Sequence, residues 1–170
     1  MNGLVHIYCG DGKGKTTAAA GLALRCAGNG GRVVVYQFLK DGKSCEIPVL
    51  KQINGITVWD TPENVKFTFE MTEEEKAELA ERYTADFEKL TREKCDMLVL
   101  DEVLHAVNLG FLPQEKLLAF LNETEDRPET VLTGREPSDA LCNAADYITE
   151  MKKIKHPYDK GITARMGIEM

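Results

Sequence analysis

The sequence lacks several features that would mark other classes of protein. No apolar run approaches the roughly 20 residues that a helix needs to cross a bilayer, and the first residues have neither the charged nor the apolar region of a secretory signal. An excess of basic residues is also missing, because the net charge is −7. Sequence-independent binding to DNA or RNA needs a basic face that releases counterions from the phosphates. We therefore expect a cytoplasmic protein with no nucleic-acid and no membrane partner.

Cysteine pairs with metal-binding spacing are absent too. The five cysteines are odd in number, and none of them belongs to a C-x-x-C pair. The cysteines therefore fit neither a zinc ribbon nor a disulfide framework, and reduced thiols are their simplest interpretation. The three histidines are scattered, so no His/Cys spacing suggests a protein-bound zinc.

What is present is an ordinary globular composition over 170 residues, with 43% hydrophobic and 29% charged residues. This length fits one domain with a single core. Apolar runs and amphipathic stretches alternate along the chain. Strands are expected at 4–8, 32–39, 55–60, 97–100, 130–133 and 147–151, and helices at 16–27, 72–90, 113–121 and 137–145. The alternation predicts an α/β fold with a mostly parallel sheet and helices on both faces, with ligands at the carboxyl ends of the strands.

A phosphate-binding loop follows the first expected strand and opens the first helix. Its glycines let successive backbone N–H groups point at anionic oxygens, and the helix N-terminus adds partial positive charge. Two lysines supply cations, and a threonine hydroxyl can join the shell of a Mg²⁺ ion. We predict that this loop binds the phosphates of ATP, that Lys13, Lys15 and Thr16 take part in catalysis, and that residues 1–170 form a single P-loop nucleotide-binding domain. The loop is Gly10-Asp11-Gly12-Lys13-Gly14-Lys15-Thr16-Thr17.

The spacing of this loop departs from the common pattern. G-x-x-x-x-G-K-[ST] would place glycine at position 9, where this sequence has Cys9, so the segment from Gly10 to Gly14 is one residue shorter. A changed loop can seat the triphosphate differently, and this bears on which atom of ATP reacts.

A second part of the nucleotide site is expected at Asp101 and Glu102. These acids directly follow the apolar strand predicted at 97–100. In a parallel sheet this strand would lie near the first one, so its carboxylates would face Thr16 and hold Mg²⁺ directly or through water. The pattern leaves open which of the two carboxylates contacts the metal.

Four further residues are candidates for ligand binding, each with an alternative. Arg135 follows the strand predicted at 130–133 and either meets a phosphate bidentately or lies on the surface. Arg25 either reaches back from its helix to the nucleotide or occupies a surface position. Phe67 and Phe69, two apart in a predicted loop, either pack on a flat apolar ligand or fill the core beneath the loop.

The C-terminal tail is a further candidate, because it carries basic residues in an acidic protein. Residues 151–170 hold five basic side chains, which suggests a position near an anionic ligand, although a solvated terminus is equally consistent. The five are Lys152, Lys153, Lys155, Lys160 and Arg165.

Together these segments resemble the P-loop class of ATP:corrinoid adenosyltransferases, which act in cobalamin biosynthesis and salvage. The resemblance spans nearly the whole chain and implies that a Co(I) corrinoid attacks C5′ of ATP, giving an adenosylcorrinoid and tripolyphosphate. The family's loop holds the nucleotide in reverse, with the γ-phosphate where other P-loop proteins keep the β-phosphate, and the short loop agrees with this. The matching segments are 10–19, Gln37-Phe38-Leu39-Lys40, 98–102, Thr133-Gly134-Arg135, 155–162 and 166–169.

The resemblance also implies roles for individual residues. Lys15 and Thr16 match the family's phosphate and Mg²⁺ residues, Glu102 matches its metal carboxylate, and Arg25 matches an arginine on the same helix. An aromatic pair in the family drives off the lower axial ligand of cobalt.

Phe67 and Phe69 match that pair, although the second residue is usually Trp. Family members are typically homodimers that rely on a separate, flavoprotein-type reductant, and many begin with a longer N-terminal segment. Two other functions remain possible on the P-loop alone. One is a kinase or ATPase, for which no base or water-orienting residue can be identified. The other is a nucleotide sensor without catalysis.

Overall fold

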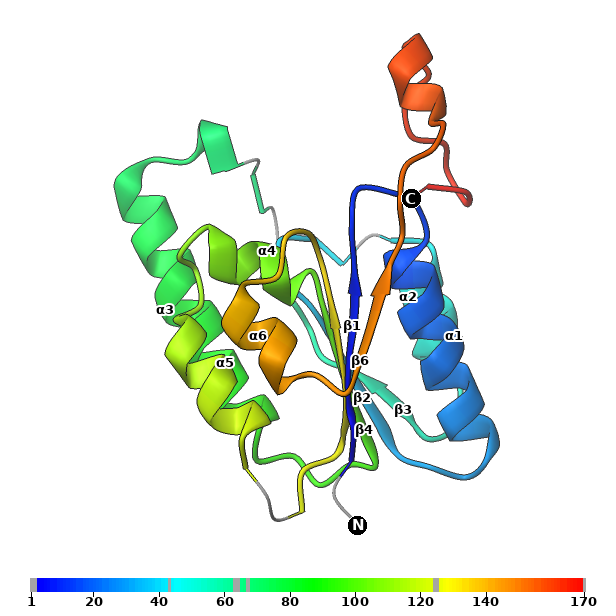
Figure 1. The fold of residues 1–170 in the computed structure, drawn as a ribbon, viewed down its shortest axis with the longest axis vertical. Helices are drawn as coiled ribbons and strands as arrows, with labels where there is room; N and C mark the ends of the chain where they lie inside the picture. Colours follow the sequence, from blue (N-terminus) through cyan, green and yellow to red (C-terminus); the bar gives the residue numbers. More distant parts are fainter. Residues whose placement is uncertain (1–2, 43, 63–64, 67, 124–125, 170) are drawn as a thin grey trace.

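The computed structural model describes residues 3–42, 44–62, 65–66, 68–123 and 126–169, and its centre is a parallel sheet (Figure 1). The strands are β1 (Val5–Cys9), β2 (Val33–Gln37), β3 (Ile56–Val58), β4 (Met97–Asp101), β5 (Glu129–Thr133) and β6 (Tyr147–Glu150). They lie in the order β3-β2-β4-β5-β1-β6, and each neighbouring pair is parallel. The expected α/β class is confirmed.

Helices cover both faces of this sheet, as the alternation of elements predicts (Figure 1). One face carries α1 (Lys15–Gly28) and α2 (Glu46–Leu50). The other carries α3 (Glu73–Leu90), α4 (Val103–Asn108), α5 (Gln114–Leu121) and α6 (Asp139–Ala144). Short 3₁₀ turns occur at Thr68–Glu70 and Pro157–Lys160. Among the described helices, none is both long and apolar enough to cross a membrane.

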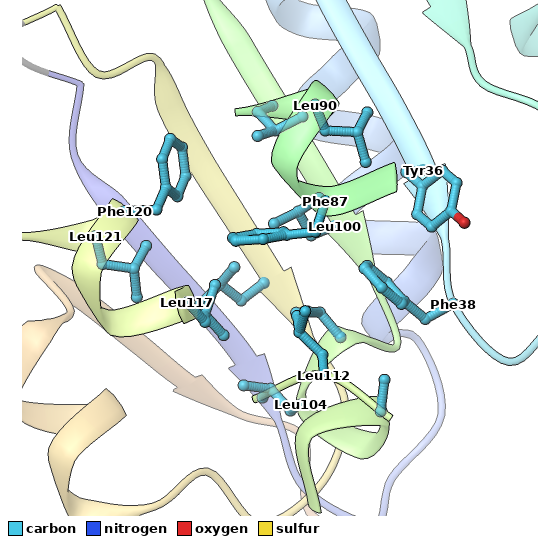
Figure 2. Close-up of a cluster of buried hydrophobic side chains, with 14 of the residues drawn as sticks. Tyr36, Phe38, Phe87, Leu90, Leu100, Leu104, Leu112, Leu117, Phe120 and Leu121 are labelled. Atoms are coloured by element: carbon cyan, nitrogen blue, oxygen red, sulfur yellow. The ribbon is translucent and has the colours of Figure 1, made fainter. Parts of the chain in front are cut away.

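The core lies in two layers that differ in side-chain size. Between the sheet and α3 to α5, aromatic rings and leucines interdigitate, among them Tyr36, Phe38 and Phe87 (Figure 2). Under α1 the core is thinner, because Ala19 and Ala23 are the buried residues through which this helix meets the strands. Strands β2 and β4 are buried along their whole length, as expected for the centre of a parallel sheet. The sheet is thus a rigid base for the loops at its carboxyl edge.

Local sequence rules account for α3 but not for two shorter helices. The expected capping box is present, with Thr72 Oγ1 accepting from Glu75 N at 3.2 Å and Thr72 N donating to Glu75 Oε2 at 2.9 Å. Helices α2 and α4 have only five and six residues. So few residues show little periodicity, and neither helix has a side-chain N-cap such as Ser138, which precedes the equally short α6.

Candidate active site

The predicted phosphate loop connects β1 to α1 at the carboxyl edge of the sheet. Gly10 and Gly14 have φ angles of 101° and 112°, which a side chain would strain. Gly12 is needed for a different reason, since an added Cβ would lie 2.5 Å from the carbonyl oxygen of Met151. The Gly12 N–H donates to this same oxygen at 2.6 Å. The loop is therefore fixed against the chain that leaves β6.

Lys15 places its ammonium group inside the loop. Its Nζ donates to the carbonyl oxygens of Gly10 at 2.8 Å and Gly12 at 2.9 Å, and the residue is buried. Burial lowers the pKa of Lys15, while the carboxylate of Glu102 acts in the opposite direction. A fixed cation at the centre of a glycine loop is an arrangement suited to phosphate oxygens.

Asp101 is the centre of a buried hydrogen-bond network at the end of β4. Its Oδ1 accepts from Thr133 Oγ1 at 2.6 Å and from Thr16 Oγ1 at 3.0 Å. Its Oδ2 accepts from Gln37 Nε2 at 3.0 Å and from Lys40 Nζ at 2.7 Å. The Asp101 side chain is only 2% exposed. The expectation that a carboxylate after this strand faces Thr16 is confirmed for Asp101.

Glu102 has a different environment from its neighbour. Its φ of 58° is unusual for a residue other than glycine, and its N–H donates to Thr133 Oγ1 at 2.8 Å. This conformation starts α4 and leaves the side chain at the wall of the cavity above the loop. Within the described part of the chain the Glu102 carboxylate makes no hydrogen bond. Glu102 is thus the carboxylate of the pair that remains available to a ligand.

The cavity above the loop has a volume of about 270 Å³. One wall is the phosphate loop with Glu102 and Arg135, and the other is the tail from His156 to Glu169. The tail runs beyond the carboxyl ends of the strands (Figure 1) and is attached where Lys153 N donates to Asp11 Oδ1 at 2.8 Å. The tail therefore lies beside the phosphate loop, and of its five basic residues Arg165 lines this cavity.

A family model described as ATP:corrinoid adenosyltransferase BtuR/CobO/CobP matches residues 1–170. The chain belongs to the ATP:corrinoid adenosyltransferase family. The corrinoid adenosyltransferase of Escherichia coli (strain K12) is 30% identical over 167 residues, which cover 98% of this chain and 85% of that protein. Corrinoid adenosyltransferase CobA of Salmonella typhimurium (strain LT2) has the same identity and coverage. The corrinoid adenosyltransferase of Pseudomonas aeruginosa is 31% identical over 178 residues, covering 98% of this chain and 83% of its own length.

The two predicted arginines lie in different places in this member of the adenosyltransferase family. Arg135 lines the cavity, and its loop is anchored because Asn108 Nδ2 donates to the Arg135 carbonyl oxygen at 3.0 Å. Gly134 before it has no room for a side chain, since a Cβ would lie 2.7 Å from that of Leu104. Arg25 is exposed in the last turn of α1, about 15 Å along the helix from Lys15, and does not line the cavity.

The predicted aromatic pair is described only in part. Phe69 lies in the 3₁₀ turn before α3 and is 81% exposed, so this ring does not fill the core. Phe67 lies outside the described residues. Phe69 also lies outside the cavity above the loop, because none of the 3₁₀ turn lines it. A surface aromatic of this kind remains compatible with contact to a flat apolar ligand.

Lys40 is a site residue that reasoning about the catalytic groups missed. It is part of the segment that matches the family, yet no role was predicted for it. Its ammonium lies between Asp101 and the Thr16 hydroxyl, 3.1 Å from Thr16 Oγ1. A lysine just after a buried strand at the carboxyl edge of the sheet is the sequence signal that could have identified it.

Proposed function

We propose that this protein transfers the 5′-deoxyadenosyl group of ATP to the Co(I) centre of a corrinoid in cobalamin biosynthesis or salvage, releasing tripolyphosphate. The observation that carries the proposal is the family match over residues 1–170. The shortened glycine loop, closed around the Lys15 ammonium beside a cavity, supports it. In this reaction the bond from C5′ to the phosphate oxygen breaks as the bond from cobalt to C5′ forms.

Such a reaction needs little acid–base catalysis from the protein, because Co(I) is itself the nucleophile. The protein's tasks are to hold C5′ in line with cobalt and to stabilise the charge on the leaving tripolyphosphate. Apart from the Gly12 N–H, which donates to Met151, the loop N–H groups from Gly10 to Thr17 suit the second task together with Lys15 inside the loop. Lys13 is exposed and lines the cavity, as Arg135 does, so both add positive charge there.

The residues around Thr16 fit a divalent cation. The Thr16 hydroxyl and the Asp101 carboxylate already bind one cation, the ammonium of Lys40. Gln37 Oε1 is buried without a hydrogen-bond partner in the described part of the chain, and offers an acceptor to metal-bound water. We assign Thr16 and Glu102 as the residues that hold Mg²⁺, with Asp101 orienting Thr16. Mg²⁺ would neutralise charge on the phosphates.

The two carboxylates should respond differently to the loss of their charge. Glu102→Gln is expected to raise the Mg²⁺ requirement at least roughly 10- to 100-fold, since losing even a residue that only supports a metal ligand commonly costs that much in metal affinity. Asp101→Asn should raise it less but lower the unfolding temperature more, because it disturbs the buried network. Activity measured over a Mg²⁺ titration, with thermal unfolding of both variants, makes the comparison. The reverse ranking in the titration would give the metal role to Asp101.

Product analysis tests the proposed reaction itself. Incubation with ATP, Mg²⁺ and chemically reduced cob(I)alamin is expected to give the spectrum of the adenosylated corrinoid and one tripolyphosphate per turnover. A P-loop kinase or ATPase would release ADP instead, and a nucleotide sensor would release nothing. Either of these results would remove the adenosyltransferase assignment.

The family resemblance also supports a proposed biological setting. A homodimer in the cytoplasm would receive Co(II) corrinoid and depend on a separate flavoprotein-type reductant to make Co(I). Sedimentation at micromolar protein concentration tests the dimer, and a monomer there would contradict it.

A further inference from the structure

The backbone just before Lys40 has an unusual conformation that sets the direction of this residue. It follows β2, and the residue before it, Leu39, has a φ of 54°. A left-handed conformation is costly for a side chain of this kind and persists only when its surroundings impose it. Here Leu39 N donates to the hydroxyl of the buried Tyr83 at 2.7 Å, and Phe38 N donates to the Asp101 carbonyl oxygen at 2.9 Å.

The core therefore directs the chain that carries Lys40. Phe38 lies with its ring inside the large hydrophobic cluster, next to Tyr36 (Figure 2). These contacts hold the end of β2 on one side, and Lys40 turns back from it toward the buried carboxylate of Asp101. The Lys40 side chain is 25% exposed, whereas the Asp101 side chain is 2% exposed. The Lys40 ammonium, which keeps partial contact with solvent, thus neutralises the Asp101 carboxylate, which has almost no contact with solvent.

The contacts of Lys40 overlap with those proposed for the metal at the Thr16 hydroxyl, and they include Asp101, which orients Thr16. Its Nζ lies 2.7 Å from Asp101 Oδ2 and 3.1 Å from Thr16 Oγ1, so it uses an acceptor position on the Thr16 hydroxyl that a metal would need. Asp101 already accepts from Thr133 and Gln37 as well. A divalent cation added among these oxygens would be close to the ammonium, and like charges repel strongly in a poorly solvated site.

We propose that Lys40 is the resident counter-cation of the metal position, and that its ammonium leaves Asp101 and Thr16 when Mg²⁺ binds with ATP. This inference rests on the Mg²⁺ site of the proposed function and deepens it. Metal binding then becomes an exchange of one cation for another. The Lys40 contacts stabilise the metal-free arrangement, and Mg²⁺ must displace them. The apparent affinity for Mg²⁺ is therefore lowered in proportion to how strongly these contacts favour the metal-free site.

The exchange has a consequence for the order of binding. Without Lys40, the buried Asp101 carboxylate would lose the ion pair that it makes in the described part of the chain, which is a costly state. With Lys40 in place, the site is stable before the metal arrives. The phosphates of ATP bring the negative charge that both the metal and the released ammonium need. We therefore expect Mg²⁺ to bind well only together with nucleotide.

The decisive variant is Lys40→Met, which keeps much of the side chain's length and removes its charge. With MgCl₂ and ATP as the probes and no corrinoid present, the free Mg²⁺ concentration that half-saturates ATP binding should fall roughly 5- to 150-fold, the usual range of coupling between two sites. Without Mg²⁺ the unfolding temperature should fall by several degrees. Calorimetric titration and thermal unfolding provide the two measurements.

Three further variants separate this exchange from a general effect on stability. Lys40→Gln keeps a hydrogen-bond donor without charge and should change Mg²⁺ binding in the same direction. Lys40→Met/Asp101→Asn should lower the unfolding temperature by less than the sum of the two single changes, because a neutral amide needs no cation. Lys116→Met removes an exposed ion pair with Glu88 and should leave the Mg²⁺ response unchanged.

Two results would overturn the exchange while leaving the metal site intact. Weaker Mg²⁺-dependent ATP binding in Lys40→Met would make Lys40 a direct phosphate ligand, and unchanged Mg²⁺ binding would show that the ammonium need not move. If neither the wild type nor Lys40→Met responds to Mg²⁺, the exchange and the proposed metal site both fail. The product analysis would still report separately on adenosyl transfer.

Discussion

Lys15→Ala is expected to reduce adenosyl transfer roughly 10²- to 10³-fold, the usual cost of removing one group that stabilises developing charge. The Lys15 ammonium lies between the carbonyl oxygens of Gly10 and Gly12, inside the loop rather than at its rim. In the proposed reaction the leaving group is a tripolyphosphate, whose negative charge grows as the bond to C5′ breaks. A cation at the centre of the loop acts most strongly on that charge. The rate is measured with chemically reduced cob(I)alamin, so that cobalt reduction does not limit it.

The interpretation of this variant depends on whether the loop stays in place. Lys15 also bridges two loop carbonyls, so its loss could loosen the loop as well as remove a charge. Lys15→Gln keeps a hydrogen-bond donor to those oxygens and should lose nearly as much activity, because the charge is what matters. Thr16→Ala should instead weaken the Mg²⁺-dependent part of the rate. Turnover near that of the wild type in Lys15→Ala would refute the phosphate role.

Much of this site follows from sequence because its parts obey local rules. A strand followed by a glycine-rich turn and Lys15-Thr16 adopts few structures other than a phosphate loop. The two left-handed glycines, Gly10 and Gly14, stand where this turn requires a positive φ. The position of Asp101 opposite Thr16 follows from parallel topology, since the carboxyl ends of such strands share one edge. These predictions needed the order of elements and nothing about side-chain packing.

The rest of the site depends on contacts that no local pattern encodes. The direction of Lys40 depends on the left-handed Leu39 and on its bond to Tyr83, which is 44 residues away in the chain. The different environments of the two acids depend on the left-handed φ of Glu102 and on its N–H bond to Thr133, which leave Glu102 at the cavity wall while Asp101 stays buried. The tail becomes a cavity wall through Asp11, far from it in sequence. Each of these is a long-range contact, visible only once the chain is folded.

The aromatic residues show how a structure can decide between alternatives that a sequence leaves open. Phe69 could have filled the core or faced a ligand, and its exposure of 81% excludes the first. An exposed aromatic ring has a hydrophobic surface that a flat apolar partner would cover. The lower face of a corrin is such a partner. A ring placed there would fill the space of the axial ligand and keep water from replacing it.

Phe69→Ala is therefore expected to slow adenosylation roughly 10- to 100-fold when Co(II) must first be reduced by a flavoprotein. Burying a Phe ring is worth about 1.5–3 kcal/mol, and each 1.36 kcal/mol is a factor of ten in rate. Without the ring an axial ligand can return, and five-coordinate Co(II) is harder to reduce because that ligand donates electrons to the metal. The loss should be much smaller when Co(I) is generated chemically beforehand, since reduction is then already complete. Comparing the two assays separates reduction from transfer.

Spectroscopy and a second variant test more directly whether Phe69 displaces the axial ligand. Co(II)cobalamin bound with ATP should show a four-coordinate signal in the wild type and less of it in Phe69→Ala. Phe69→Trp, which supplies the aromatic that is usual in the resembling family, should keep or increase that signal, because a larger ring fills the same space. An equal loss of activity in both assays would mean that the ring contributes to corrinoid binding in general. If Phe69→Ala retains the four-coordinate fraction of the wild type, the ring does not displace the axial ligand, and its exposure on the 3₁₀ turn needs another explanation.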